Sequence, residues 1–120
     1  MLRSSTTSPI DFDWQQLRQL AGGDADFEHE LLGLFMKDAE VMLQELDQAI
    51  AIQCVTTTES VAHALRGASA NVGAIALSAA ALQLEQIARQ GSLQGARGHL
   101  QQTRHHYRRV KTHLQSRLRG

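Results

Sequence analysis

Apolar side chains recur at intervals of three and four residues through most of the chain, a spacing typical of α-helices. No segment shows the sustained alternation of polar and β-branched apolar residues that predicts a strand. Because amphipathic helices joined by short connections bury their apolar stripes most simply against one another, a bundle follows. The pattern therefore predicts an all-α protein, an antiparallel up-down four-helix bundle with a short extra N-terminal helix.

The sequence also predicts where the helices begin and end. They are expected over residues 13–20, 24–53, 56–73, 74–90 and 93–118. Asp24 is expected to cap the second helix, and Thr56 with Glu59 has the spacing of a capping box for the third. Gly73 is expected to end that third helix.

The apolar stripes predict which residues form the core. The expected core positions are Trp14, Leu17 and Leu20 in the first helix, Phe27, Leu31, Leu34, Phe35, Met42, Leu46 and Ala49 in the second, and Ala96, Leu100, Thr103, Tyr107, Val110 and Leu114 in the last.

A length of 120 residues suits one domain, expected over residues 11–118. The polar residues 1–10 are expected to be a disordered lead-in.

The net charge of zero conceals an uneven distribution. Residues 11–59 hold eleven acidic and two basic residues, whereas residues 101–120 hold six basic residues and no acidic one. One interpretation is that acidic and basic helices pack side by side and neutralise each other; the other is a basic tail that binds nucleic acid or membrane. Tyr107 is the only aromatic residue near those basic residues, so stacking on bases is not favoured. We therefore expect no nucleic-acid partner and no membrane contact.

Few sequence features bear on location and assembly. Cys54 is the only cysteine, and the N-terminus lacks the apolar segment of a secretory signal, so a cytoplasmic protein is expected. Four helices in one chain favour a monomer, although an apolar seam on the last helix would support a dimer.

One helical segment places a histidine opposite its core face. On a wheel of about 100° per residue centred on Leu65, the core face comprises Val61, Ala62, Ala68, Ser69 and Val72. His63 lies about 160° from Leu65 and is expected to point outward. Arg66, Gly67 and Ala70 share that outward face, three, four and seven residues after His63.

The residues around His63 suit a chemical role for its imidazole. Gly67 and Ala70 leave the surface beside the ring uncrowded, and a mid-helix glycine costs about 1 kcal/mol relative to alanine. Arg66 supplies a permanent cation one turn away, suited to phosphate oxygens. A neutral imidazole is a competent nucleophile near pH 7. Geometry alone leaves open the alternative of an ordinary exposed histidine with a glycine nearby.

The sequence around this histidine resembles a known family. Residues 63–74 read HALRGASANVGA and resemble H-x-L-K-G-x-[SA]-x-x-[LV]-G, the signature of the histidine-containing phosphotransfer (HPt) domains of bacterial multistep two-component phosphorelays. Arg66 stands where lysine is usual, which keeps the charge and changes the shape. Residues 84–91, LEQIARQG, resemble the family's L-E-x-x-A-R-x-G segment, and weaker similarities lie upstream at residues 20–24, LAGGD, and 34–39, LFMKDA.

The resemblance implies a two-way phosphoryl relay. His63 would be phosphorylated on a ring nitrogen, Arg66 would help hold the phosphoryl group, and Gly67 would clear the approach. A response-regulator receiver domain carrying phosphoaspartate and Mg²⁺ would dock on this face, and a second receiver would take the phosphoryl group onward. The implied protein is a phosphocarrier without a metal, a cofactor or kinase activity of its own. It works with receiver domains and a sensor histidine kinase, either free-standing or as a fragment of a hybrid kinase.

The resemblance also implies supporting residues on the following helix. Glu85 occupies the position whose side chain orients the active imidazole through its other nitrogen. Wheel geometry places Glu85 about 100° and Arg89 about 140° from core-facing Leu84, so both are expected at the edge of the groove beside the histidine. Ala70 and Leu82 are further candidates for that edge and for docking contacts, as is the exposed Ala64. The alternatives are a solvated Glu85, an Arg89 that only caps its helix, and a Leu82 that belongs to the core.

Other interpretations remain. The dimerisation and phosphoacceptor domain of a sensor histidine kinase also carries an outward histidine, but an acid usually follows that histidine, with a proline close behind. Here alanine follows it, and the only proline is Pro9. A helical interaction module with an inactive histidine site is a second alternative. His99, His106 and His113 share a face of the last helix but lie about 10 Å apart in succession, too far for one metal ion.

Overall fold

The computed structural model describes residues 12–119, which form five helices and no strand. In chain order they are α1 (Trp14–Leu20), α2 (Ala25–Ala51), α3 (Val55–Val72), α4 (Ile75–Arg89) and α5 (Ala96–Arg119). The predicted all-α class is confirmed, while the predicted lead-in at residues 1–10 lies outside the described residues. None of the helices within residues 12–119 combines the length and the apolar character that crossing a membrane requires.

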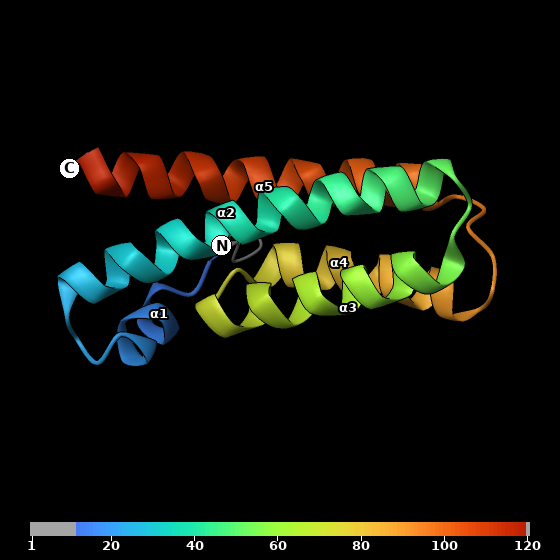
Figure 1. Cartoon of the computed structure of the whole chain (residues 1–120). Coiled ribbons are helices and arrows are strands. Elements are labelled where there is room, and N and C mark those ends of the chain that lie inside the picture. The colour runs from blue at the N-terminus through green and yellow to red at the C-terminus, as the bar shows by residue number, and fades with distance from the viewer. Residues whose placement is uncertain (1–11, 120) are drawn as a thin grey trace, which may run out of the picture.

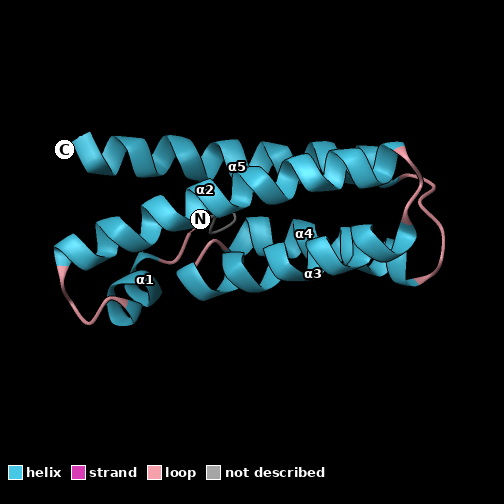
Figure 2. Cartoon of the chain, in the orientation of Figure 1, coloured by secondary structure: helices cyan, strands magenta, loops and turns pink. Residues whose placement is uncertain are grey.

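The four long helices form an antiparallel bundle (Figure 1). Each packs against the next in the chain, and α5 closes the ring by packing against α2 as well as α4. The connections between these helices are short loops (Figure 2). The short α1 packs against α2 and α3. This is the predicted up-down four-helix bundle with an extra N-terminal helix, and it places α3 and α4 side by side.

Two predicted helix boundaries are confirmed. The Asp24 side chain accepts hydrogen bonds from the backbone N–H groups two and three residues later, at 2.9 and 3.2 Å. Gly73 ends α3 in the left-handed conformation, with a φ of 91°. A Cβ at Gly73 would lie 2.5 Å from the carbonyl oxygen of Asp13, so space and conformation both require glycine there. Since the Asp13 N–H donates to the Gly73 carbonyl at 2.7 Å, this junction also fixes the start of α1 on the end of α3.

The predicted capping box of α3 is wrong. The helix begins at Val55, one residue before Thr56, with Cys54 in the N-cap position and no side-chain capping bond. The Glu59 carboxylate accepts a hydrogen bond from Arg89 of α4 at 3.2 Å instead of turning back to the helix start. A tertiary ion pair has therefore replaced the local contact that the spacing suggested.

The core confirms the predicted stripe of α5 and corrects that of α2. All six predicted core residues of α5 are buried. In α2, Phe27 and Leu34 are 44% and 60% exposed, and in α1 Leu20 is also exposed. The buried apolar residues of α2 are Leu32, Phe35, Ala39, Leu43, Leu46, Ala49 and Ile50. Because α2 carries apolar residues on opposite faces, intervals of three and four can follow either face, and packing against α3 and α5 selects one.

Charged side chains join α5 to α2. Arg97 forms an ion pair with Asp47, Arg104 Nη2 lies 3.8 Å from the same carboxylate, and Lys111 Nζ lies 3.5 Å from Glu40. These are residues of the basic C-terminal helix and of the acidic N-terminal half. The interpretation in which acidic and basic helices pack side by side and neutralise each other is therefore confirmed for these pairs.

Candidate functional site

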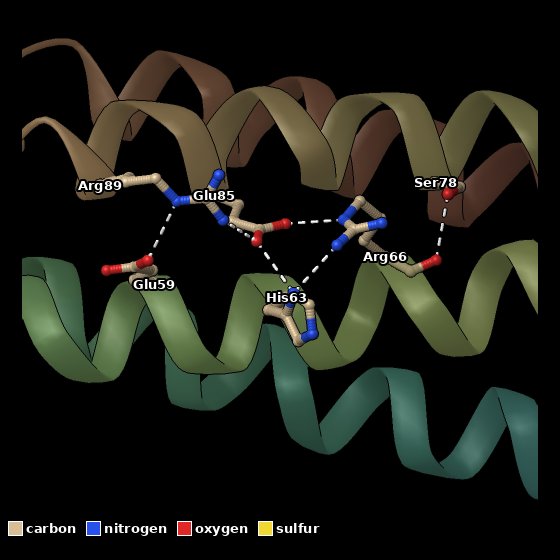
Figure 3. A network of polar contacts seen from close by, with 6 residues as sticks. All are labelled: Glu59, His63, Arg66, Ser78, Glu85 and Arg89. Carbon is tan, nitrogen blue, oxygen red and sulfur yellow. Dashed lines mark hydrogen bonds and ion pairs between the residues drawn. The ribbon is translucent and has the colours of Figure 1, made fainter.

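His63 lies on the outward face of α3, as the helical wheel predicts, with 62% of its side chain exposed. Leu65 and Ala62, on the opposite side of the helix, are fully buried. Among the described residues, the hydrogen-bond contacts of the ring are all made at Nδ1, which faces α4. Nε2 lies on the other side of the ring, away from these contacts (Figure 3). One ring nitrogen is thus held by the protein, and the other remains for an external partner.

Glu85 of α4 is a buried carboxylate directly beside this ring, with an exposure of only 1%. Its Oε2 lies 2.9 Å from His63 Nδ1. Arg66 Nε donates to Oε1 at 2.7 Å, and Arg89 Nη2 donates to Oε2 at 2.5 Å. The hydrogen bond from Arg66 holds the pKa of Glu85 below its ordinary value of 4.5, despite burial, and the contact with His63 acts in the same direction. Glu85 is therefore an anion and a hydrogen-bond acceptor at neutral pH.

The proton on His63 Nδ1 has two incompatible neighbours. Arg66 Nη2 lies 2.9 Å from Nδ1, the same distance as Glu85 Oε2. A guanidinium only donates and a carboxylate only accepts, so one protonation state of Nδ1 satisfies one neighbour and not the other. With a proton on Nδ1, the ring donates to Glu85 and the lone pair is on Nε2. With the lone pair on Nδ1, the ring accepts from Arg66 and, when neutral, carries its proton on Nε2.

The contacts extend along both helices (Figure 3). Arg89 Nε donates to Glu59 Oε2 at 3.2 Å, so Arg89 bridges carboxylates on α3 and α4. Ser78 Oγ donates to the backbone carbonyl of Arg66 at 3.0 Å and fastens the two helices at the other end. We call the connected charged side chains the α3–α4 network: Glu59, His63, Arg66, Glu85 and Arg89.

Glu59 and Ser78 are not among the site residues that the sequence predicts. A signal for Glu59 was present, because Glu59, His63 and Arg66 stand four and three residues apart and so share one face of α3. On α4, Ser78 and Glu85 are likewise seven residues apart. Once α3 and α4 are known to be neighbours, these spacings identify the residues of each helix that face the other helix.

The remaining predicted site residues lie around this network. Gly67 is exposed, and a Cβ at this position would meet nothing within 4 Å. Ala70 is exposed, and its carbonyl accepts a hydrogen bond from Gln16 of α1 at 2.5 Å. Leu82 is half-buried on α4. It lies four residues after Ser78 and three before Glu85, hence on the same face of the helix.

A groove of about 380 Å³ opens beside the imidazole. Its lining residues are Thr56, Glu59, Ser60, His63, Glu85 and Arg89. Arg89 thus lies at the groove as the sequence suggests, whereas Ala70 and Leu82 are not among the described residues that line it. The groove extends from His63 toward the N-terminal end of α3. Gly67 and Ala70 lie on the other side of His63, toward the C-terminal end of α3.

A metal centre is not found in the described part of the chain. No group of three or more histidine, cysteine, aspartate or glutamate side chains within residues 12–119 is placed to hold a metal ion. The α3–α4 network is the candidate site because it surrounds the exposed imidazole of His63.

Comparison with known proteins places this arrangement in a family. The family model of the Hpt domain matches residues 30–115. The chain belongs to the Hpt domain family. No match is found among curated proteins.

Solved structures resemble this Hpt domain over most of its length. Histidine-containing phosphotransfer protein B (HptB) from Pseudomonas aeruginosa PAO1 is 30% identical, with a TM-score of 0.86; the match covers 94% of this chain and 99% of that one. Histidine-containing phosphotransfer protein MtHPt2 from Medicago truncatula is 25% identical, with a TM-score of 0.79 and coverage of 88% and 76%. A putative histidine-containing phosphotransfer protein from rice shares the fold at 24% identity, with a TM-score of 0.82 and coverage of 92% and 81%.

Proposed function

We propose that this Hpt domain carries phosphoryl groups between aspartates of response-regulator receiver domains through a phosphohistidine at His63. The observation that carries the proposal is an imidazole that is 62% exposed while its Nδ1 lies 2.9 Å from a buried carboxylate. Membership of the Hpt family and the likeness to HptB support a phosphorelay carrier. They favour it over the dimerisation domain of a sensor kinase, and the exposed imidazole with a carboxylate on Nδ1 favours it over an inactive interaction module.

The reaction follows from the proton on Nδ1. When Nδ1–H donates to Glu85, the lone pair of the neutral ring is on Nε2 and faces outward. This lone pair attacks the phosphorus of an aspartyl phosphate; the N–P bond forms, the P–O bond to the aspartate breaks, and its electron pair stays on the aspartate carboxylate. The ring becomes a cation that keeps its Nδ1 proton, and the Glu85 anion stabilises it. Transfer to a second receiver reverses these steps.

The neighbouring residues supply charge and space. Arg66, one turn from His63, would donate to the phosphoryl oxygens as negative charge gathers on them. Gly67 leaves room for the receiver, since no packing within the described chain accounts for a glycine at this exposed helical position. The bare helix surface at Ala64, Gly67 and Ala70 would accept the receiver's edge. Glu85 would orient the ring, an effect that outer carboxylates commonly have on functional histidines.

The proposal includes the partners and setting that the sequence predicts. The receiver supplies Mg²⁺, and the Hpt domain contributes positioning and a cation without a metal, cofactor or kinase activity of its own. It acts in the cytoplasm as a monomer, with receiver domains and a sensor histidine kinase as partners and without nucleic acid or membrane contact. Incubation with ATP alone, light scattering and cell fractionation test these parts separately.

Transfer from a labelled receiver tests the proposal. Wild-type protein incubated with ³²P-phosphorylated receiver domains from the source organism should gain label that is acid-labile and base-stable. The variant His63→Gln should gain none while keeping its circular-dichroism spectrum. Labelling of His63→Gln at the wild-type rate would rule out His63 as the acceptor.

A further inference from the structure

Arg66 occupies a resting position that conflicts with its proposed task. Its Nε donates to Glu85 Oε1 at 2.7 Å, and its Nη2 lies 2.9 Å from His63 Nδ1. Figure 3 shows Nε2 on the other side of the imidazole, so a phosphoryl group on Nε2 would lie away from these contacts. To bind it, the guanidinium must leave both present partners. The departure of Arg66 also removes the donor that competes for Nδ1.

When Arg66 moves away, the negative charge of the Glu85 carboxylate needs another cation beside it. Glu85 is 1% exposed, and a buried carboxylate without a cation takes up a proton rather than stay charged. A protonated Glu85 would donate to Nδ1 instead of accepting from it. The imidazole would then hold its proton on Nε2 and would lose the outward lone pair. The reaction therefore needs a second cation that stays on Glu85 when Arg66 moves.

Arg89 is placed to be that cation. Its Nη2 lies 2.5 Å from Glu85 Oε2, the same oxygen that faces His63 Nδ1. Its Nε donates to Glu59 across the groove at 3.2 Å, which anchors the guanidinium at a second point. The four charged groups around the ring, Glu59, Arg66, Glu85 and Arg89, comprise two cations and two anions. When Arg66 turns away, Arg89 stays with the buried anion, and the half-exposed Glu59 remains hydrated.

We infer that Arg89, anchored by Glu59, is a positioning residue that keeps Glu85 ionised and hydrogen-bonded to His63 Nδ1 while Arg66 turns to the phosphoryl group. The inference rests on the proposed function for its purpose, but its charge arrangement is testable without any phosphoryl donor. It gives the two arginines different tasks: Arg66 moves and Arg89 stays. It also assigns a role to Glu59, which is four residues before the histidine.

The first experiment titrates the Glu85 carboxyl by ¹³C NMR in variants that imitate the departure of Arg66. In Arg66→Ala, Glu85 should remain ionised at pH 7, because Arg89 stays. In Arg66→Ala/Arg89→Ala the midpoint should rise by about two pH units or more, and Arg66→Ala/Arg89→Lys should reverse most of that rise. The control Arg66→Ala/Arg97→Ala removes an arginine that pairs with Asp47 and should match Arg66→Ala. Equal midpoints in Arg66→Ala and Arg66→Ala/Arg89→Ala would overturn the inference.

The second experiment uses single variants and does not depend on the double variant folding. Arg89→Ala should lower the maximal rate of transfer from a saturating phosphorylated receiver about 10-fold, with KM nearly unchanged and with Arg89→Lys restoring most of the rate. Glu59→Gln should lower it about 3-fold. Wild-type rates in both Arg89→Ala and Glu59→Gln would overturn the inference. If the wild-type protein accepts no phosphoryl group at all, the proposed function fails while the titration still decides the role of Arg89.

Discussion

Charged side chains join α2 to α5 and α3 to α4 in the described part of the chain, and the α3–α4 contacts include an imidazole, that of His63. Between α2 and α5, the carboxylates of Asp47 and Glu40 are about half exposed and pair with arginine and lysine from the solvent side. Between α3 and α4, the carboxylate of Glu85 is buried beneath two arginines and a histidine. Similar residue types are present in both places, so burial and the presence of His63 set the second apart.

The difference teaches what each set of charges does. Exposed ion pairs contribute little to stability because water and salt screen them. A buried carboxylate is costly unless it is compensated, and it fixes the groups that compensate it. The α2–α5 pairs therefore serve mainly to match an acidic helix with a basic one. The α3–α4 network is a structure that positions one ring nitrogen inward and the other outward.

A large side chain added to the surface of α3 should change the transfer rate more than any other substitution that compares the two regions, and the same change in α5 should not affect it. Gly67→Gln is expected to slow transfer from a phosphorylated receiver by about 100-fold, because a long side chain displaces the reacting atoms. Its thermal stability should rise slightly, since glycine is a poor helix residue and a Cβ at this position meets nothing within 4 Å. The matched control is Gly98→Gln in α5, where a Cβ also meets nothing. A normal transfer rate in Gly67→Gln would show that the receiver approaches from elsewhere.

Removing one carboxylate charge from each region should give the second-largest difference in transfer rate. Glu85→Gln is expected to slow transfer about 10- to 100-fold, because the amide no longer compensates the charged phosphohistidine ring. Asp47→Asn, which removes the carboxylate partner of Arg97, should transfer at the wild-type rate. Stopped-flow or quench measurements with one receiver preparation compare the pair directly. Equal rates would mean that Glu85 is as incidental to the reaction as Asp47.

Removing one cation from each region should have a smaller effect. Arg66→Ala is expected to slow transfer about 10-fold, the loss of one charge-assisted hydrogen bond to the phosphoryl group. Arg66→Lys should retain much of the rate, because the positive charge remains one turn from the ring. Arg97→Ala in α5 should leave the rate unchanged. If Arg66→Ala and Arg97→Ala behave alike in transfer and in phosphohistidine lifetime, Arg66 has no special role.

Acid should distinguish the two regions least, because the pKa values of Glu85 and Glu40 are both lowered and their contributions to stability change in the same direction. The hydrogen bond from Arg66 lowers the pKa of Glu85 below 4.5, so its contribution to stability is present above that value and is lost as pH falls below it. The pKa of Glu40 is also lowered, chiefly by the hydrogen bond that the Tyr107 hydroxyl donates to it at 2.6 Å. Denaturant titrations from pH 7 to pH 3 should therefore show falling stability. Glu85→Gln should flatten the curve, and a curve as steep as wild type would contradict the lowered pKa.

The sequence predicts the buried residues and side-chain contacts of some regions better than those of others. The apolar stripe of α5 has charged residues on its other faces, so its six core positions are correctly predicted. The α2 stripe is partly wrong at Phe27 and Leu34, because apolar residues on two faces leave the choice to tertiary packing. A wheel places His63 outward from local periodicity alone. Which side chains touch it depends on the pairing of α3 with α4, which no local rule supplies.

Glu59 illustrates this limit most clearly. Its spacing from Thr56 satisfies the rule for a capping box, and a local rule has no information about an arginine 30 residues later. Because Cys54 rather than Thr56 is the N-cap, Glu59 does not stand at the third position of the helix, and its carboxylate pairs with the charged Arg89 instead. The resemblance to the HPt signature identified Glu85 as a neighbour of the ring, but no motif indicated that two arginines share it.

The position of the phosphorus on the His63 ring tests the central claim most directly. Protein labelled with ¹⁵N in its histidines and phosphorylated by a receiver domain can be followed by ³¹P and ¹⁵N NMR at neutral pH. A phosphorus coupled to Nε2 of His63, with a proton retained on Nδ1, is the predicted result. A phosphorus on Nδ1 would contradict it, because that atom is the one the structure turns toward Glu85.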